Sequence, residues 1–550
     1  MNRKRNASVR WSLISLVMLL ILAVSPIWTQ AATDEGGYVI AYFRSDPSQT
    51  GEKIQKLHYG YSRDGLKWYE LNNNAPVADL LYPLRDPFLD KGPDGIWRLV
   101  YTTPDVDSNG NNIPNYYLGY AESTDLIHWT NQKRLDLMKN YRPANTVYNA
   151  WAPEWVYNDE TGKYIIFWSS TLNASSPSNN KHYKATTTDW NTFSDASILF
   201  DPGVKTIDAN MLRYDKNGED FYYLFYKDES ASPMKIKQTW ASEPVNKIEY
   251  EDPAHISDNY ITPDYTEGPE AFKIIGQNKW HLIYDYWSQG KYGLKTTTNI
   301  EDPTAWSAEN SNARFPYKMR HAGVADLTES ELWALINQYS LDAHYKLDAA
   351  ALDASGNNRN GTLIGSPVFT SSGGVAGGYV NLDGIDDGIQ LANSPGTGFM
   401  HDAFSMRSVS MWFKADQTSS TQVLYDEGGA SNGFAVKIEN GNLLAGIANN
   451  NVRKSVSTAF TDTLGWHHVA AVFREGTLEL YLDGALKASV NSGIPTVGAH
   501  TDFGGLGKRF AQDAFNGTND GAYFKGKMDQ VKIFDVPLFG QDVVDLYETP

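Results

Sequence analysis

Short segments in which apolar and polar residues alternate recur between residues 38 and 330. This alternation, with many aromatic and β-branched residues, predicts β-strands, and no long helical periodicity interrupts the series. After four of the five segments, a second predicted strand enters a polar turn that carries Trp or Phe. Five strand pairs at similar spacing predict an all-β fold, a five-bladed β-propeller. The five segments are residues 38–43, 97–101, 164–168, 222–226 and 280–284.

The two ends of the repeat region complement each other. The first unit, residues 38–70, lacks an innermost strand of its own, whereas no further blade follows His321. We therefore expect residues 320–327 to supply the inner strand of the first blade, which would close the ring and hold both of its ends.

Beyond about residue 340 the pattern changes to short alternating strands separated by Gly, Asn and Ser turns. Such segments are typical of antiparallel sheets. The sequence thus predicts a propeller over residues 33–335 and a second all-β domain over residues 341–550, and the absence of a long linker favours a fixed arrangement. The segments are residues 345–348, 380–387, 408–414, 465–470, 478–484 and 526–533.

The amino terminus has the features of a secretory signal peptide. Basic residues precede the apolar run 11–24, and small residues follow at Ala31 and Ala32. This order predicts cleavage near Ala31 or Ala32, which removes residues 1–31 and places the mature chain outside the cell. The alternative is an uncleaved anchor that holds the same domains at the membrane.

The charge of the chain excludes some classes of partner. The formal net charge is −18, and it becomes −22 without residues 1–31, which hold four basic residues and no acidic one. An acidic chain is a poor ligand for nucleic acid or for an anionic membrane surface. The chain has no Cys, which excludes thiol nucleophiles, disulfides and Cys-ligated zinc.

A polar residue stands at the head of an early strand in each repeat. Because the first strands of propeller blades line a common central channel, these side chains are expected to converge. Glycosidic bond cleavage needs one carboxylic acid to protonate the leaving oxygen and one carboxylate to activate water or attack directly, so this grouping predicts a glycoside-cleaving site. The five residues are Asp86, Glu154, Asp208, Glu267 and His321.

The proximity of these carboxylates predicts that their pKa values separate. Mutual repulsion in a partly desolvated site raises the pKa of one group, while another stays ionised. We expect the raised pKa at Glu267 and an ionised Asp86. Their placement two blades apart favours the wide spacing of an inverting enzyme, about 6.5 to 9.5 Å.

Four short motifs resemble glycoside hydrolase family 43, which contains five-bladed arabinanases, arabinofuranosidases and xylosidases. The resemblance covers residues 38–330 and lies in the order and spacing of the motifs. They are Arg85-Asp86-Pro87, Trp151-Ala152-Pro153-Glu154, Ile207-Asp208-Ala209 and Glu267-Gly268-Pro269.

The resemblance implies an inverting mechanism. Asp86 matches the general base, Glu267 the general acid, and Asp208 the residue that tunes the pKa of the acid and orients it. His321 is similar to a late His-Gly segment whose His lies on the channel axis near a metal ion or water, so a structural Ca²⁺ or Na⁺ there is a candidate. The chemistry itself requires no cofactor.

The sequence departs from the family pattern at two positions. Glu154 stands where the family usually has Asp, and Ala322 interrupts the His-Gly pair. Glu154 is therefore either a substrate contact or a satisfied structural partner. Arg320 is a further candidate for substrate binding. Aromatic residues near the motifs are either stacking platforms for sugar or parts of the core; they are Trp151, Trp155, Tyr265 and Trp287.

The strand order beyond residue 340 is similar to the laminin-G-like or concanavalin-like jelly roll, over nearly all of residues 341–550. This resemblance implies a β-sandwich that binds carbohydrate or packs on the propeller. Asp383, Asp386 and Asp387 are candidates for a Ca²⁺ site, but a solvated turn is the favoured interpretation. The His residues lack zinc-ligand spacing.

These features predict a secreted, monomeric glycoside hydrolase that removes arabinofuranosyl or related pentosyl units from plant-type polysaccharide or oligosaccharide. Xylosidase and galactosidase activities are alternatives. So are a retaining fructan-cleaving propeller, which Ser45-Asp46-Pro47 partly resembles, and a catalytically inactive carbohydrate-binding or adhesion protein. Loops 105–115 and 171–180 are expected to shape the mouth of the channel.

Overall fold

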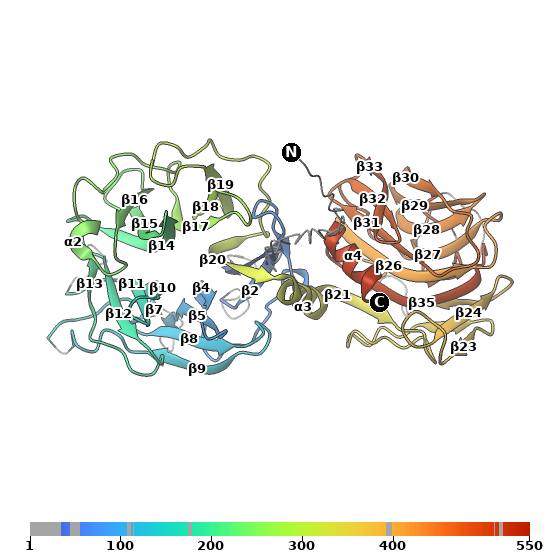
Figure 1. Ribbon diagram of the computed structural model, residues 1–550, viewed down its shortest axis with the longest axis horizontal. Coiled ribbons are helices and arrows are strands. Elements are labelled where there is room, and N and C mark those ends of the chain that lie inside the picture. The colour runs from blue at the N-terminus through green and yellow to red at the C-terminus, as the bar shows by residue number, and fades with distance from the viewer. Residues whose placement is uncertain are drawn as a thin grey trace, which may run out of the picture.

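The regular secondary structure of the computed structural model is almost entirely β-strand, arranged in two units (Figure 1). It describes residues 35–44, 55–106, 112–113, 115–142, 144–173, 179–391, 399–510, 512–515 and 521–550. The predicted signal peptide and parts of both loops expected at the channel mouth lie outside the described residues. Within the described part of the chain, no helix is long and apolar enough to cross a membrane.

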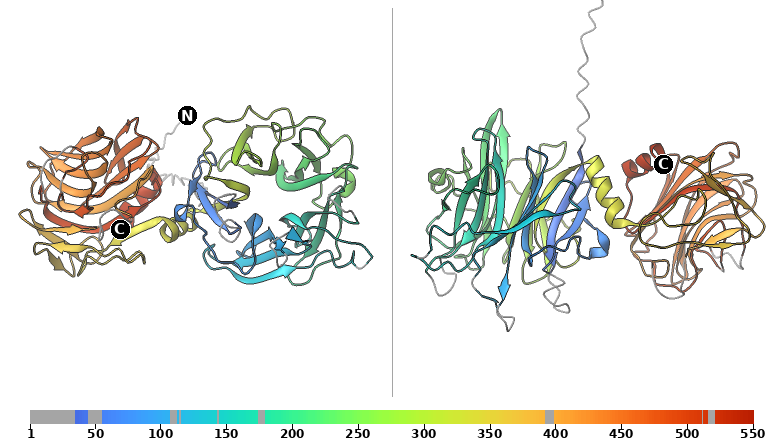
Figure 2. Two further views of the ribbon diagram at one scale, coloured as in Figure 1. Left: turned by 180° about the vertical axis from the view of Figure 1, so that it is seen from behind. Right: turned by 90° about the horizontal axis from the view of Figure 1, so that it is seen from below.

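Five sheets arranged in a ring form the amino-terminal unit (Figures 1 and 2). The innermost strands β20, β4, β10, β14 and β17 contact one another in that order, and β17 contacts β20, so the ring is closed. The predicted five-bladed propeller is confirmed. From the innermost strand outward, the blades are β20 (Met319–Thr328), β1 (Glu35–Arg44), β2 (His58–Ser62) and β3 (Tyr69–Glu70); β4 (Arg85–Lys91), β5 (Trp97–Thr102), β8 (Leu118–Ser123) and β9 (Thr130–Leu135); β10 (Trp151–Asn158), β11 (Lys163–Ser170), β12 (Lys181–Thr187) and β13 (Ser197–Phe200); β14 (Thr206–Lys216), β15 (Glu219–Asp228) and β16 (Lys235–Ala241); β17 (Glu267–Lys273), β18 (Trp280–Tyr286) and β19 (Lys291–Thr297).

The first blade combines strands from both ends of the repeat region. Strand β20 pairs antiparallel with β1, and Tyr38 lies opposite Asp326. This is the ring closure predicted from the sequence. Because one sheet contains both ends, neither end can separate without breaking strand pairs.

Aromatic side chains fill much of the space within and between the blades. Trp155 is buried, and its ring meets those of Phe88, Tyr164 and Trp190 edge-on. Tyr120 stacks on Trp190 with ring centroids 4.9 Å apart. Trp155 is therefore a core residue, which is one of the two interpretations that the sequence left open.

Two antiparallel sheets form the carboxyl-terminal unit, and a buried apolar cluster that includes Phe413, Phe434 and Leu480 lies between them. The predicted β-sandwich is confirmed. One sheet contains β23 (Val368–Thr370), β24 (Tyr379–Asp383), β35 (Lys525–Phe534), β26 (Met406–Ala415), β31 (His467–Arg474), β32 (Thr477–Leu482) and β33 (Ala485–Asn491), with β21 (Leu341–Tyr345) paired to β35; the other contains β22 (Thr362–Ile364), β25 (Gly388–Gln390), β34 (Gly505–Leu506), β27 (Gln422–Gly428), β28 (Gly433–Glu439), β29 (Asn442–Asn449) and β30 (Val452–Ala459).

Two helices lie where the units meet (Figure 1). Helix α3 (Glu329–Ser340) begins at Thr328, whose hydroxyl accepts a hydrogen bond from the Glu331 amide, and α4 (Gly540–Glu548) follows β35. One continuous apolar cluster contains Leu332 of α3 and Val543 of α4 together with residues of the first two blades and of the sandwich. A shared core of this kind fixes the two units against each other, as the short connection predicted.

A partly buried ion-pair cluster also joins the two units. Arg63, directly after β2, pairs with Glu329 of α3 and with Asp542 of α4. Nearby, the Tyr61 hydroxyl donates to the Pro537 carbonyl oxygen at 2.7 Å. Burial raises the pKa of Asp542, and Arg63 opposes that rise. The propeller thus supplies the cation that compensates a buried carboxylate next to the sandwich.

Candidate active site

Each of the five inner strands carries a β-bulge near its first residues. The pairing register between the first and second strands of each blade shifts at this point. One residue at each bulge has a positive φ, between 25° and 53°. This conformation is costly for residues other than Gly, and bulges that redirect side chains are common beside active sites. The residues are Asp86, Ala152, Asp208, Gly268 and His321.

The observed bulges differ in position from the register that the polar residues of the sequence predicted. The spacing in the sequence predicted that Glu154 and Glu267 occupy the same position in their blades as Asp86. In the structure, Ala152 and Gly268 occupy the bulge position that corresponds to Asp86. Glu154 lies two residues further along β10, and Glu267 lies one residue earlier on β17. A polar residue can stand on either side of a bulge, so the distance in sequence between polar residues does not fix the register.

At four blade boundaries, a side chain at the end of the second strand contacts the bulge region of the next blade's inner strand. In three of them a side-chain oxygen accepts a hydrogen bond from a bulge amide, whereas Lys227 donates to a carboxylate. These contacts hold the bulges across blade boundaries, so the site depends on the closed ring. The pairs are Thr102 with Ala152 (2.9 Å), Ser169 with Asp208 (3.2 Å), Lys227 with Glu267 (2.8 Å) and Asp285 with His321 (3.4 Å).

Asp86 has two neighbours that fix its orientation. The Thr102 hydroxyl donates to Oδ2 at 2.7 Å, and Nδ1 of His321 lies 3.4 Å from Oδ1. Gly268 permits the His321 ring to come close, because a Cβ atom at residue 268 would lie 3.0 Å from the ring. The Asp86 side chain remains 18% exposed. It is therefore an oriented carboxyl group that water can reach.

Asp208 is the most deeply buried of the three carboxyl groups expected to act on substrate. Burial raises its pKa to about 7, His321 opposes the rise, and repulsion from Glu267 and Asp86 adds to it. Its Oδ2 accepts a hydrogen bond from the Gly268 amide at 3.3 Å. From the sequence we expected a raised pKa at Glu267; the structure shows a raised pKa at Asp208, because that side chain is buried.

Glu267 lies between two cations. Nζ of Lys227 is 2.8 Å from Oε2, and Nη2 of Arg320 is 2.7 Å from Oε1. The Lys227 side chain is 4% exposed and also pairs with Glu229, while Arg320 also pairs with Asp285. Two charged donors stabilise a negative charge and fix the plane of the carboxylate. Glu267 is thus held in a fixed orientation between two cations.

Glu154 belongs to a second, buried layer further along the inner strands. The Asn210 amide group donates to Oε2 of Glu154 at 3.2 Å and to Oε2 of Glu270 at 2.8 Å. The backbone amides of Met211 and Val324 donate to the same two carboxyl groups. This layer links β10, β14, β17 and β20. The structure therefore agrees with Glu154 as a satisfied structural partner rather than as a substrate contact.

The buried layer predicts how stability depends on pH. Burial raises the pKa of both Glu154 and Glu270. The folded chain then binds these protons more tightly than the unfolded chain, where the pKa of Glu is about 4.3. The associated stability is complete below that pH and is lost as the pH rises. Glu270→Gln cannot ionise, so its melting temperature should fall less than that of the parent between about pH 5 and about pH 8, as measured by calorimetry.

The control for this prediction is the same change at a residue near the surface. Glu301 is 39% exposed and pairs with Lys216 at 2.8 Å. Glu301→Gln should keep the pH dependence of the parent. If Glu270→Gln also kept it, the buried layer would not be the source of the pH dependence.

The remaining candidates for substrate binding differ in exposure. Trp287 is 43% exposed and Tyr265 is 49% exposed, whereas Trp151 is half-buried at the start of β10. These three rings stay candidates for stacking on sugar. Arg320 is engaged by carboxylates, so it organises the charge of Glu267.

The described residues contain one group of three acidic or His side chains with ligand atoms within 4.8 Å of one another, namely Asp383, Asp386 and Asp387. Oδ1 of Asp383 accepts backbone amides of its own turn, and Oδ1 of Asp387 accepts the Ser366 amide at 2.7 Å. Backbone amides thus already contact two of these three carboxylates, and both interpretations of the turn stay predictions. His321 belongs to no such group among the described residues, so an axial ion there remains a prediction from the resemblance alone.

Sequence reasoning missed several residues of the site. A usable signal was present, because a polar residue directly follows each of four alternating segments and ends up at the next inner strand. These residues are Thr102, Ser169, Lys227 and Asp285. Asn210 and Glu270 gave no such signal, because neither residue directly follows one of the alternating segments.

A closed ring of five blades with grouped carboxyl groups defines a glycosyl hydrolase domain. The chain belongs to a family related to glycoside hydrolase family 43 and described as a probable glycosyl hydrolase domain, whose profile matches residues 34–332. Residues 383–544 match a laminin-G profile of the concanavalin A-like lectin/glucanase superfamily. Both resemblances found in the sequence are confirmed.

Solved structures resemble the chain at low similarity. Domain 4 of AbnA, a GH43 extracellular arabinanase from Geobacillus stearothermophilus in complex with arabinotriose, is 23% identical, with 38% of this chain and 98% of that chain covered and a TM-score of 0.31. An exo-β-1,3-galactanase from Phanerochaete chrysosporium, solved with galactose, is 12% identical, with 83% and 96% covered and a TM-score of 0.33. The binding domain of botulinum neurotoxin serotype D is 20% identical, with 39% and 52% covered and a TM-score of 0.31, so the match spans about half of that structure. No curated protein matches the chain. At these TM-scores the likenesses do not identify a substrate.

Proposed function

We propose that the propeller hydrolyses glycosidic bonds of plant-type polysaccharide or oligosaccharide with inversion, releasing arabinofuranosyl or related pentosyl or galactosyl units. The observation that carries this proposal is the grouping of Asp86, Asp208 and Glu267 in three different surroundings: accessible, buried and cation-paired. Different surroundings separate the protonation states of carboxyl groups, which acid and base catalysis at one bond requires.

Asp86 is the proposed general base. Its Oδ2 is engaged by the Thr102 hydroxyl, and the side chain is accessible enough to contact a water molecule. A carboxylate with a fixed orientation can take a proton from that water as the water attacks the sugar carbon.

Asp208 and Glu267 form the proposed acid pair. Glu267 matches the general acid of the family, but two cations stabilise its charge, whereas Asp208 retains a proton near neutral pH. The raised pKa of Asp208 favours a proton on this pair near neutral pH, and that proton is available for the leaving oxygen. This agrees with a role for Asp208 in tuning the acid.

The acid pair predicts a pH limit on activity. The proton on Asp208 is lost as the pH rises through about 7, so kcat/KM should fall in that range. Asn at residue 208 cannot ionise, so the lower kcat/KM of Asp208→Asn should not fall as the pH rises through about 7. The check is a pH profile of kcat/KM for parent and variant on one aryl glycoside. A limb at the same pH in Asp208→Asn would assign it to another group.

The family resemblance supports the sugar class, and the predicted signal peptide supports action outside the cell. The mature chain should be assayed beside Asp86→Asn on aryl α-L-arabinofuranoside, β-D-xyloside and β-D-galactoside and on arabinan and arabinogalactan. Hydrolysis of one of these classes by the parent and its loss in the variant is the expected result. Binding of a polysaccharide without hydrolysis of any substrate would favour the carbohydrate-binding alternative.

A further inference from the structure

A cavity of about 590 Å³ lies where the propeller and the sandwich meet. Asn73, from the short 3₁₀ turn η1 (Asn72–Asn74) of the propeller, lines it together with residues of the sandwich unit, and none of the bulge residues does. Its size falls in the range of about 300–1,000 Å³ that is typical of small-molecule sites. Because both units contribute, the complete cavity exists only in the two-domain chain.

The charged residues that line this junction cavity balance one another. Asp342 pairs with both Arg359 and Arg407, and the exposed Asp402 adds a second carboxylate. Burial raises the pKa of Asp535, and repulsion from Asp342 adds to the rise, which favours a neutral carboxyl group. Two guanidinium groups therefore lie among the carboxyl groups, and the lining combines hydrogen-bond donors and acceptors.

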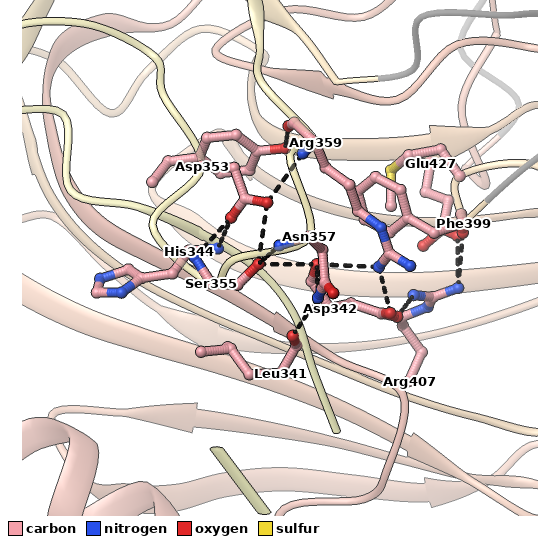
Figure 3. A network of polar contacts seen from close by, with 12 residues as sticks. Leu341, Asp342, His344, Asp353, Ser355, Asn357, Arg359, Phe399, Arg407 and Glu427 are labelled. Atoms are coloured by element: carbon pink, nitrogen blue, oxygen red, sulfur yellow. Dashed lines mark hydrogen bonds and ion pairs between the residues drawn. The ribbon is translucent and has the colours of Figure 1, made fainter. Parts of the chain in front are cut away.

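Hydrogen bonds hold these groups in place, as Figure 3 shows. Arg407 donates to the Phe399 carbonyl oxygen at 2.9 Å and lies 3.3 Å from Oε1 of the buried Glu427. The Arg359 amide donates to Asp353 at 2.9 Å, and its guanidinium group lies 4.2 Å from the centre of the Phe399 ring. A lining that is already ordered loses little entropy when a ligand binds.

Two polar atoms of this lining have unused hydrogen-bonding capacity. Nε of Arg407 and Oδ1 of Asp535 are buried without a hydrogen-bond partner in the part of the chain that the structure describes. The Arg407 side chain is 4% exposed. Buried polar groups in folded proteins are nearly always paired, so these two atoms mark places behind the cavity surface where an ordered water or a small shift of the lining would supply the missing bond.

Among the described residues, Asn73 represents the propeller in the lining of the junction cavity. Asn72, Asn73 and Asn74 all have positive φ, between 51° and 59°. The side chains of Asn72 and Asn74 donate to the carbonyl oxygens of Pro76 and Tyr317, whereas Asn73 is exposed and lines the cavity. An amide side chain both donates and accepts, as a sugar hydroxyl does.

We propose that the junction cavity is a second binding site, which takes a neutral saccharide unit. Sugar hydroxyl groups donate and accept at neighbouring positions, and this matches adjacent guanidinium, carboxylate and amide groups. An anionic ligand would meet the carboxylates of Asp342 and Asp402, and a cationic ligand would meet the two Arg side chains. A neutral sugar avoids both kinds of charge repulsion, and its binding would involve the propeller and the sandwich at once.

The test is hydrogen–deuterium exchange of the full two-domain chain carrying Asp86→Asn, so that the sugars stay intact. Arabinotriose, xylotriose and galactotriose are added separately over a concentration series. At least one should protect peptides that cover residues 342–359 and 399–407. Asn73→Ala and Arg359→Gln, each in this background, should weaken the protection about fivefold to tenfold, as the loss of one or two hydrogen bonds predicts.

A matched control separates loss of a contact from loss of fold. Asn440 is exposed and has a φ of 51°, equal to that of Asn73, but it does not line the cavity. Asn440→Ala should leave the protection unchanged. Absence of protection with all three sugars, or protection that both cavity variants retain, would overturn the proposal. Hydrolysis is measured separately on the parent chain, so a failure of the proposed catalytic function is distinguishable from a failure of this one.

Discussion

Changing Glu267 to glutamine is expected to lower kcat/KM on a glycoside by about 100-fold to 10,000-fold. The amide keeps the shape of the side chain but carries no charge and takes no part in proton transfer. It also leaves Lys227 and Arg320, which contact the carboxylate at 2.8 and 2.7 Å, facing a neutral group. Steady-state rates of parent and variant on an aryl glycoside and on a polysaccharide check this result.

The leaving group shows which step the variant impairs. If Glu267 delivers the proton, the loss should be smaller for an acidic aryl leaving group than for a sugar, whereas the loss in Asp86→Asn should be similar for both. Glu229→Gln is the matched control, because Glu229 pairs with the same Lys227 at 2.9 Å but lies outside the inner strands. It should lose less than about tenfold. Equal losses in the two Glu variants would contradict a catalytic role for Glu267.

Replacing Arg63 by alanine is expected to lower the free energy of unfolding by about 3–5 kcal/mol. Arg63 pairs with Glu329 and with Asp542, whose side chain is fully buried. The substitution leaves a buried carboxylate without its cation and weakens the contact between the two units. Urea unfolding followed by tryptophan fluorescence measures the change.

Two further variants define the source of this loss. Arg213 pairs with Asp159 and Asp220 but is 41% exposed, so Arg213→Ala should cost at most about 1 kcal/mol. Adding Asp542→Asn to Arg63→Ala removes the unpaired charge and should restore part of the stability. If Arg63→Ala cost no more than Arg213→Ala, the ion-pair cluster would contribute little to the junction.

The general architecture could be predicted because it depends on simple patterns. Alternating segments at similar spacing set the number of blades, and the missing inner strand of the first unit required residues 320–327 to complete it. The change to Gly-rich and Asn-rich turns after residue 340 marked the sandwich. These features follow from hydrophobic periodicity, which a single sequence displays directly.

The details of the site could be predicted only in part. Asp86 and Asp208 do occupy equivalent bulges, but Glu154 and Glu267 do not, because backbone register at a bulge is not visible in polar spacing. The protonation pattern was also beyond the sequence. It depends on which carboxyl group is buried and on the contact between Lys227 and Glu267, and both arise from packing between blades.

The most direct test of the account is proton NMR of the first sugar anomer that the mature chain releases from its best substrate, recorded beside Asp86→Asn. The account predicts that the parent releases the inverted anomer and that the variant releases almost none. Release of the retained anomer, or an undiminished rate in Asp86→Asn, would contradict the assignment of the propeller carboxyl groups to catalysis with inversion.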